Sequence, residues 1–277
     1  MHVGDGWTLT RASSYSACIV TAARGQPQRG VMHSVFPAAA NVTFPDGFVL
    51  SLNAVTSPCM PNGLQLSALP GTFPFPVLRA GMPVLFGAQR LLIEAVDCSL
   101  DLSSCTQWNP HIERPAQLDM EIVERNRASL LEHVPRTEFQ ETCSNSDAAY
   151  CGSVRCMAQF LCGRGVGLTP AGDDVLAGWM AVNWLLYGPL SCFLEACQQI
   201  MSVAKQQTHL LSQCWLGYAA AGNVAMPIKA LLDALTKEDD VQLAAAMQAV
   251  LSMGATSGHD LIEGILSGLA GYSRGVC

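Results

Sequence analysis

The sequence predicts an α+β protein, with a strand-rich N-terminal half packed on a helical C-terminal half. Eleven of the fifteen prolines precede residue 116, and proline interrupts helices, so long helices are expected only after that point. Short β-branched and aromatic runs between turn residues occupy the first half. Apolar residues at helical spacing occupy the second. We therefore expect two domains, residues 1–115 and 116–277.

Strands are expected wherever such a run is bounded by turn residues. Pro45-Asp46-Gly47 and Gly87-Ala88 are turns that each join two runs into a β-hairpin. Residues 58–76 are loop-rich and receive no element, and the polar residues 99–115 are interpreted as the connection between the halves. The expected strands are 15–22, 31–36, 42–44, 48–52, 84–86 and 90–96.

Helices are expected from residue 116 onward. Residues 175–194 carry no charge and are long enough to cross a bilayer. Gly188-Pro189 interrupts this run and Asn183 lies within it, so we expect a buried helical hairpin and no membrane span. The expected helices are 118–131, 154–162, 175–187, 190–204, 209–221, 226–235, 241–253 and 261–272.

Composition limits the partners and the compartment. Only 13% of the residues are charged, against about 25% in typical domains, so we expect part of the surface to be buried in a homo-oligomer or against other subunits. A well-packed monomer is the alternative. The net charge is −7 and there is no lysine- or arginine-rich run, which argues against nucleic acid. The twelve cysteines have no C-x-x-C spacing and no signal peptide is recognisable, so reduced thiols in the cytoplasm are expected.

The segment 163–178 carries the strongest functional signal. Gly163, Gly165 and Gly167 let the backbone turn tightly and approach a ligand closely. Thr169 and Pro170 are typical of a helix N-cap and first helical residue. The loop would then end on free amides at the positive end of a helix dipole, which favours an anion.

Two adjacent carboxylates, Asp173 and Asp174, follow in the first turn of that helix and are the candidate catalytic residues. The alternative is structural, since acidic residues in a first turn complement the dipole of any helix. The candidate substrate-binding residues of this segment are Gly165, Gly167, Thr169 and Gly172.

Residues 254–260 form a second predicted helix start, again with glycine, hydroxyl and acidic residues before an apolar run. Ser257 and Asp260 match the capping-box pattern. The functional interpretation is that Thr256, Ser257, Gly258 and Asp260 offer hydrogen-bonding groups to the same ligand; an ordinary capping box is the alternative.

Two pairs of polar residues give weaker signals. Thr208 and Ser212 share one helical face and either bond to helix carbonyls or line a polar pocket. Ser34 and Asn41 flank an apolar run, where turn chemistry is the alternative to substrate binding. The chain has no P-loop, no G-x-S-x-G elbow and no histidine pair at metal spacing, so no metal ligands are predicted.

Taken together, these blocks resemble a bacterial domain family of unknown function that includes the AllH-type subunit of oxamate carbamoyltransferase. The resemblance covers about residues 30 to 270, and the glycine–Thr-Pro–Asp-Asp block is its most specific part. It implies transfer of a carbamoyl group between oxalurate and phosphate, giving oxamate and carbamoyl phosphate in allantoin (purine) catabolism. It also implies partner subunits in a multisubunit complex.

The expected site is a cleft between the halves that holds this small anionic substrate. Asp173 or Asp174 would accept hydrogen bonds from substrate NH₂ groups; a bridging Mg²⁺ is the second interpretation, because carboxylates otherwise repel phosphate. Two other functions stay open. One is a non-catalytic assembly subunit of such a complex, and the other is a Mg²⁺-dependent enzyme acting on another small anionic metabolite.

Overall fold

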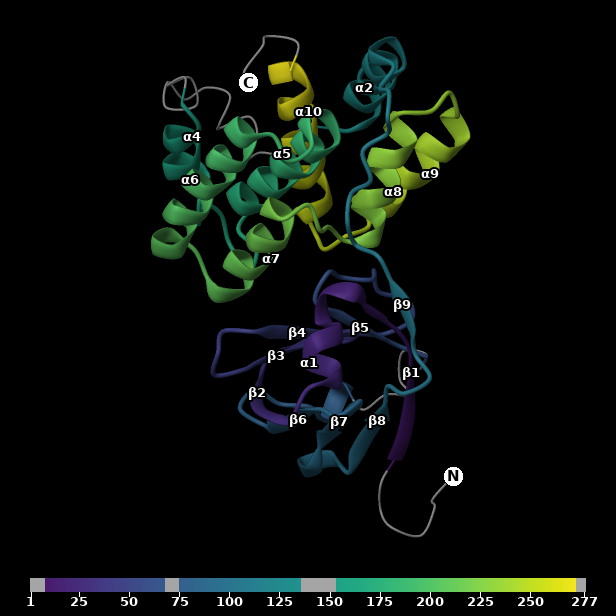
Figure 1. Cartoon of the computed structure of the whole chain (residues 1–277), viewed down its shortest axis with the longest axis vertical. Coiled ribbons are helices and arrows are strands. Elements are labelled where there is room, and N and C mark those ends of the chain that lie inside the picture. Colours follow the sequence, from purple (N-terminus) through teal and green to yellow (C-terminus); the bar gives the residue numbers. More distant parts are fainter. Residues whose placement is uncertain (1–7, 68–74, 136–152, 273–277) are drawn as a thin grey trace. The chain divides into compact units, whose positions relative to one another are not determined.

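The protein is α+β, with a strand-rich N-terminal half and a helical C-terminal half (Figure 1). The structure, a computed structural model, describes residues 8–67, 75–135 and 153–272. The chain divides into two compact units, residues 1–110 and 111–277.

The first unit is a curled sheet that closes on itself. Its described strands follow the order β5-β4-β3-β2-β6-β7-β8-β1-β9, and β5 also pairs antiparallel with β1, which joins the two ends of the series. The strands are β1 (Thr8–Ser16), β2 (Gln28–Val35), β3 (Ala39–Thr43), β4 (Val49–Asn53), β5 (Gly63–Leu66), β6 (Pro83–Gly87), β7 (Arg90–Ile93), β8 (Cys98–Asp101) and β9 (Thr106–Trp108).

Both expected hairpins are confirmed. In the β3–β4 turn the Asp46 carboxylate accepts a hydrogen bond from the Phe48 amide at 2.9 Å. The β6–β7 turn is displaced by one residue from its expected place, because Gly87 pairs with Arg90 and the two residues between them are Ala88 and Gln89, with φ angles of 47° and 57°. Two successive positive φ angles match the right-handed twist of the flanking strands.

Other strand predictions were wrong. The expected strand 15–22 ends at Ser16, where the chain turns into η1 (Ala17–Ile19) and α1 (Val20–Arg24). Three strands, β5, β8 and β9, fall wholly or partly in segments that were given no element. Each of them pairs in parallel with a strand not joined to it by a hairpin: β5 with β4, and β8 and β9 with β1. Such pairing leaves no local turn signal in the sequence.

The core of the first unit lies inside the closed sheet. Every residue of β4 and β5 is buried, so neither strand has a solvated face, and the polar residues that alternate along them, Ser51, Asn53 and Gln65, are buried as well. Apolar side chains from around the sheet meet there, including Leu52, Leu64 and Phe86. Burial of this apolar surface stabilises the closed arrangement.

The second unit consists of helices packed around α5 and α10. A methyl group on Gly178 would lie 2.0 Å from the Leu261 carbonyl oxygen, and one on Gly264 would lie 2.0 Å from that of Val175. The two helix backbones therefore touch without intervening side chains. The described helices are α2 (Met120–His133), α4 (Val154–Leu161), α5 (Ala171–Tyr187), α6 (Ser191–Gln207), α7 (Leu210–Ala220), α8 (Met226–Leu235), α9 (Asp240–Leu251) and α10 (Ser257–Tyr272).

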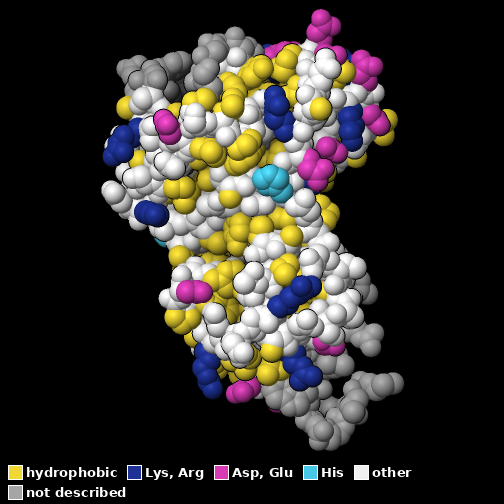
Figure 2. All heavy atoms as spheres, viewed as in Figure 1, with side chains coloured by type: hydrophobic (Ala, Val, Ile, Leu, Met, Phe, Trp, Pro, Cys, Tyr) yellow, Lys and Arg dark blue, Asp and Glu magenta, His cyan; other side chains and the backbone are white. Residues whose placement is uncertain are grey.

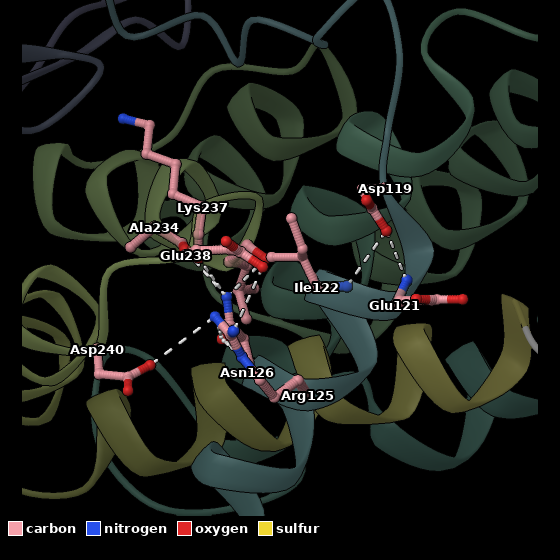
Figure 3. Close-up of polar contacts among 10 residues, drawn as sticks. Asp119, Glu121, Ile122, Arg125, Asn126, Ala234, Lys237, Glu238 and Asp240 are labelled. Carbon is pink, nitrogen blue, oxygen red and sulfur yellow. Dashed lines mark hydrogen bonds and ion pairs between the residues drawn. The ribbon is translucent and has the colours of Figure 1, made fainter.

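Polar contacts attach α2 to the turn between α8 and α9 (Figure 3). The Asn126 side-chain amide donates hydrogen bonds to the carbonyl oxygens of Ala234, Leu235 and Lys237, at 3.3, 3.1 and 2.9 Å. Asp119 caps the start of α2 by accepting from the amides of Glu121 and Ile122. Asn126 thus supplies a donor to the Leu235 and Lys237 carbonyls at and just beyond the end of α8, and a second donor to the Ala234 carbonyl, which also accepts from the Lys237 amide.

The expected helices all appear, with shifted ends. Across the part of the chain that the structure describes, no helix combines the length and the apolar character needed to traverse a bilayer. On the face drawn in Figure 2, charged side chains lie scattered among broad hydrophobic and uncharged areas, in line with the low charged fraction. The expectation of uniformly reduced thiols was wrong, since Cys156 and Cys192 are disulfide-bonded. Disulfides follow spatial proximity, which spacing in the sequence does not reveal.

Candidate functional site

The two helix starts that the sequence singles out lie together in the second unit. The hydroxyls of Thr169, just before α5, and Ser257, the first residue of α10, are 3.3 Å apart. The Ser257 side chain also hydrogen-bonds the Asp174 carboxyl group. The close backbone packing of α5 on α10 brings these groups together.

The glycine loop, residues 163–168, connects α4 to this site. Gly163, Gly165 and Gly167 have φ angles of +69°, +120° and +94°, a conformation that side-chain-bearing residues rarely adopt. Among the described residues none accepts a hydrogen bond from the amides of Gly165 and Gly167. A methyl group added to Gly167 would meet no atom within 4 Å. Amides without acceptors, in a loop where every second residue has a positive φ, form the kind of concavity that binds anions.

A cation lies within this loop, which the sequence argument did not include. The Arg164 guanidinium sits 4.0 Å above the Phe160 ring and forms no ion pair with a described carboxylate. Val166, at the tip of the loop, is 92% exposed. Arg164 lies between Gly163 and Gly165, just before a helix, and this pattern in the sequence could have identified the cation.

Side chains from two helices fix the loop at both ends. The Asp173 carboxylate accepts a hydrogen bond from the Gly163 amide at 2.8 Å and another from the Thr208 hydroxyl. At the other end, the Ser212 hydroxyl donates to the Leu168 carbonyl oxygen at 3.3 Å. Both Asp173 oxygens are therefore engaged within the protein, and this contact set positions the loop.

Two glycines do not offer their amides as expected. The Gly172 amide donates to the Arg164 carbonyl oxygen at 2.9 Å, and the Gly258 amide to that of Met253 at 3.0 Å. A methyl group at either position would lie 2.1 Å from a neighbouring backbone oxygen, of Leu161 for the first and of Val250 for the second. These glycines permit close packing of the backbone.

Both helix starts also differ in detail from the prediction. Pro170, not Thr169, is the N-cap residue of α5, so the Thr169 hydroxyl is directed to Ser257 instead. The capping box was wrong as well, because Ser257 is already helical. The carbonyl of exposed Thr256 accepts from the Asp260 amide, and Asp260 itself is buried.

Asp174 is the one described residue with a fully buried side-chain oxygen, Oδ2, that lacks a hydrogen-bond partner. The residue is 9% exposed. Burial raises the pKa of Asp174 well above its usual value; the Ser257 hydrogen bond opposes this shift, and the nearby charges of Asp260 and Asp173 add to it. Burial of a carboxylate oxygen that has no donor, here Oδ2, disfavours the ionised form of Asp174.

The described residues offer neither a reactive thiol nor a metal-binding cluster at this site. Burial and the charge of Asp173 raise the pKa of the Cys162 thiol to about 12, so it is not a nucleophile near neutral pH. The described residues contain no group of three or more His, Cys, Asp or Glu side chains placed to hold a metal ion.

Ser34 and Asn41 belong to the first unit. The Asn41 amide donates to the Ser34 hydroxyl at 3.0 Å, and its Oδ1 accepts from the Ser51 hydroxyl at 2.7 Å. Asn62 in turn donates to Ser51 at 3.1 Å. These residues form a buried chain of hydrogen bonds across neighbouring strands. The sequence argument missed Ser51 and Asn62, although a polar residue within a β-run such as Phe48–Leu52 was a visible signal.

Two family models match the chain. The model described as oxamate carbamoyltransferase subunit AllH matches residues 161–269, which contain the glycine loop and both helix starts. The model described as the AllH family N-terminal domain matches residues 11–107. No solved structure matches the chain.

Proposed function

The chain belongs to the AllH family, which is named for a subunit of oxamate carbamoyltransferase, and we propose that its glycine loop binds the anionic group of a small carbamoyl compound. One observation carries the proposal: the amides of Gly165 and Gly167, which no described residue accepts from, lie in a loop that also holds Arg164, a cation without an ion pair to any described carboxylate. Membership of a subunit family also supports assembly with other polypeptides.

The proposed reaction is carbamoyl transfer between oxalurate and phosphate. A phosphate oxygen attacks the carbamoyl carbon, and the bond from that carbon to the oxamate nitrogen breaks. The proton of hydrogen phosphate passes to that nitrogen, so that oxamate leaves as a neutral amide and carbamoyl phosphate forms. The loop amides would stabilise the negative charge that develops on the attacked carbonyl oxygen. The Thr169 and Ser257 hydroxyls are placed beside the loop and would orient the amide groups of the substrate.

Charge balance supports an anion at this place. Asp173 has both oxygens engaged by donors, and Asp174 is favoured in its protonated form. Burial that raises the pKa of Asp174, the carboxyl group nearest the two hydroxyls, lowers the negative charge that would repel the ligand. In this proposal Asp173 is a positioning residue, and the bridging Mg²⁺, which was the second interpretation of the sequence, is not required to relieve repulsion between carboxylates and phosphate.

The second candidate is a non-catalytic assembly subunit of the same complex. Val166 favours it, since a valine that is 92% exposed at a loop tip suits contact with another polypeptide. In that case the glycine loop would bind a partner chain and no small molecule. The homo-oligomer and the cytoplasmic location remain predictions under either function.

Thermal unfolding of the whole chain tests the proposal. Carbamoyl phosphate, oxalurate, oxamate and phosphate are each titrated, and saturable stabilisation of about 2.7 kcal/mol is expected at a hundred times Kd. Arg164→Gln removes the loop cation and should weaken binding of each anion about tenfold. Arg155→Gln, on α4 outside the loop, is the matched control.

No stabilisation by any of the four compounds would exclude a ligand site on this chain alone. Equal weakening in the Arg155 variant would show that only net charge matters. If the four compounds fail while Val166→Asp abolishes co-purification of other subunits, the assembly function is supported.

A further inference from the structure

A cavity of about 300 Å³ lies in the second unit, away from the glycine loop. It is lined by residues of α5, α6 and α10 together with the start of α4, and it shares no lining residue with the site described above. Its volume is at the lower end of the range for pockets that bind small molecules.

Asn183 gives the cavity a polar interior. This residue lies in the middle of the apolar helix α5, is 4% exposed and lines the cavity. Its Nδ2 donates to the Trp179 carbonyl oxygen at 2.7 Å, while no described residue donates to its Oδ1. Gly268 leaves room for this amide, since a methyl group there would lie 3.0 Å from Nδ2.

Aromatic rings and a carboxylate complete the lining. Trp179 and Phe193 both line the cavity, with ring centroids 6.1 Å apart. Glu195 is exposed at the lining and has no ion pair with a described residue. No lysine, arginine or histidine occurs among the described lining residues, so the cavity offers acceptors and aromatic surface without a charge that would attract an anion.

We propose that this cavity is a second ligand site, which binds a small organic ammonium compound. The ammonium group fits against Trp179, which is half-buried at the lining, because aromatic faces attract cations; Phe193, 1% exposed, packs behind this ring. The Asn183 carbonyl oxygen accepts a hydrogen bond inside the cavity, and the Glu195 carboxylate supplies the opposite charge at its exposed edge. The ligand is thus opposite in charge to the compounds proposed for the glycine loop, so the two sites do not compete.

Isothermal titration of the whole chain with choline tests this, with the uncharged isostere 3,3-dimethyl-1-butanol as the comparison ligand. Choline should bind saturably and at least about fivefold more tightly than the isostere, as expected of a cation–π contact. Glu195→Gln keeps the shape of the side chain and should weaken choline binding about threefold without affecting the isostere. Glu238→Gln makes the same charge change at an exposed place outside the cavity and should have no effect.

Several outcomes would overturn the proposal. They are the absence of saturable choline binding, equal affinity for choline and its isostere, and equal weakening by both glutamate substitutions. Trp179→Phe should also reduce the affinity for choline while the response to phosphate or oxamate is unchanged. A parallel loss of both responses would mean that the cavity is not a separate site.

Discussion

Placing a methyl group between α5 and α10 should destabilise the helical unit. In Gly178→Ala the new carbon would lie 2.0 Å from the Leu261 carbonyl oxygen, more than 1 Å inside an ordinary contact. Since the backbone of α5 fixes the position of the new Cβ and the oxygen belongs to the backbone of α10, no side-chain rotation relieves the overlap and the helices must move apart. Such overpacking costs about 1–3 kcal/mol, which lowers Tm by about 2–10 °C for a unit of this size.

The assay is urea unfolding followed by circular dichroism, with Gly217→Ala as the control. Gly217 lies within α7, where the nearest atom to an added methyl group is 3.7 Å away. That substitution should raise stability by about 0.5–1 kcal/mol, because alanine loses less backbone entropy in a helix. Wild-type stability of Gly178→Ala, or equal destabilisation by both variants, would refute the argument that the α5–α10 contact requires a glycine.

Three further predictions follow from single contacts. Burial raises the pKa of Asp174, so the folded chain keeps a proton that the unfolded chain releases, and stability is lost as pH rises through the folded pKa, by up to about 1.4 kcal/mol per pH unit. Asp174→Asn removes this loss, so the unfolding free energy of the variant in urea, relative to that of the wild type, should grow as pH rises from 4 to 8. If the two unfolding free energies change in parallel with pH, Asp174 does not have a raised pKa. Thr208→Val deletes a donor to Asp173 and should loosen the glycine loop, which faster tryptic cleavage after Arg164 would reveal; an unchanged rate would mean that the hydroxyl is dispensable. Asn126→Leu removes the donor from the carbonyls of Leu235 and Lys237 and one of two donors from that of Ala234, and it should lower the unfolding free energy by about 2–3 kcal/mol in urea titrations. A loss under 0.5 kcal/mol would show that water replaces the amide.

The sequence by itself determined the fold class, the positions of the helices and the two β-hairpins. These features depend on residues that are close along the chain: proline excludes helix locally, helical spacing repeats every few residues, and a turn such as Pro45-Asp46-Gly47 lies between the strands it joins. The sequence also singled out the glycine loop and the second helix start, because glycine, threonine and serine before an apolar run form a local pattern.

Only the tertiary structure decided what those residues contact. In the folded chain β1 pairs with β5 and closes the sheet, and Gly172 and Gly258 allow close packing of the backbone. Both oxygens of Asp173 accept hydrogen bonds, whereas Oδ2 of Asp174 has no partner among the described residues. Each of these outcomes depends on atoms brought together from distant parts of the chain. The charge of a carboxyl group and the availability of an amide depend on burial and on hydrogen-bond partners, and those are properties of the packed molecule.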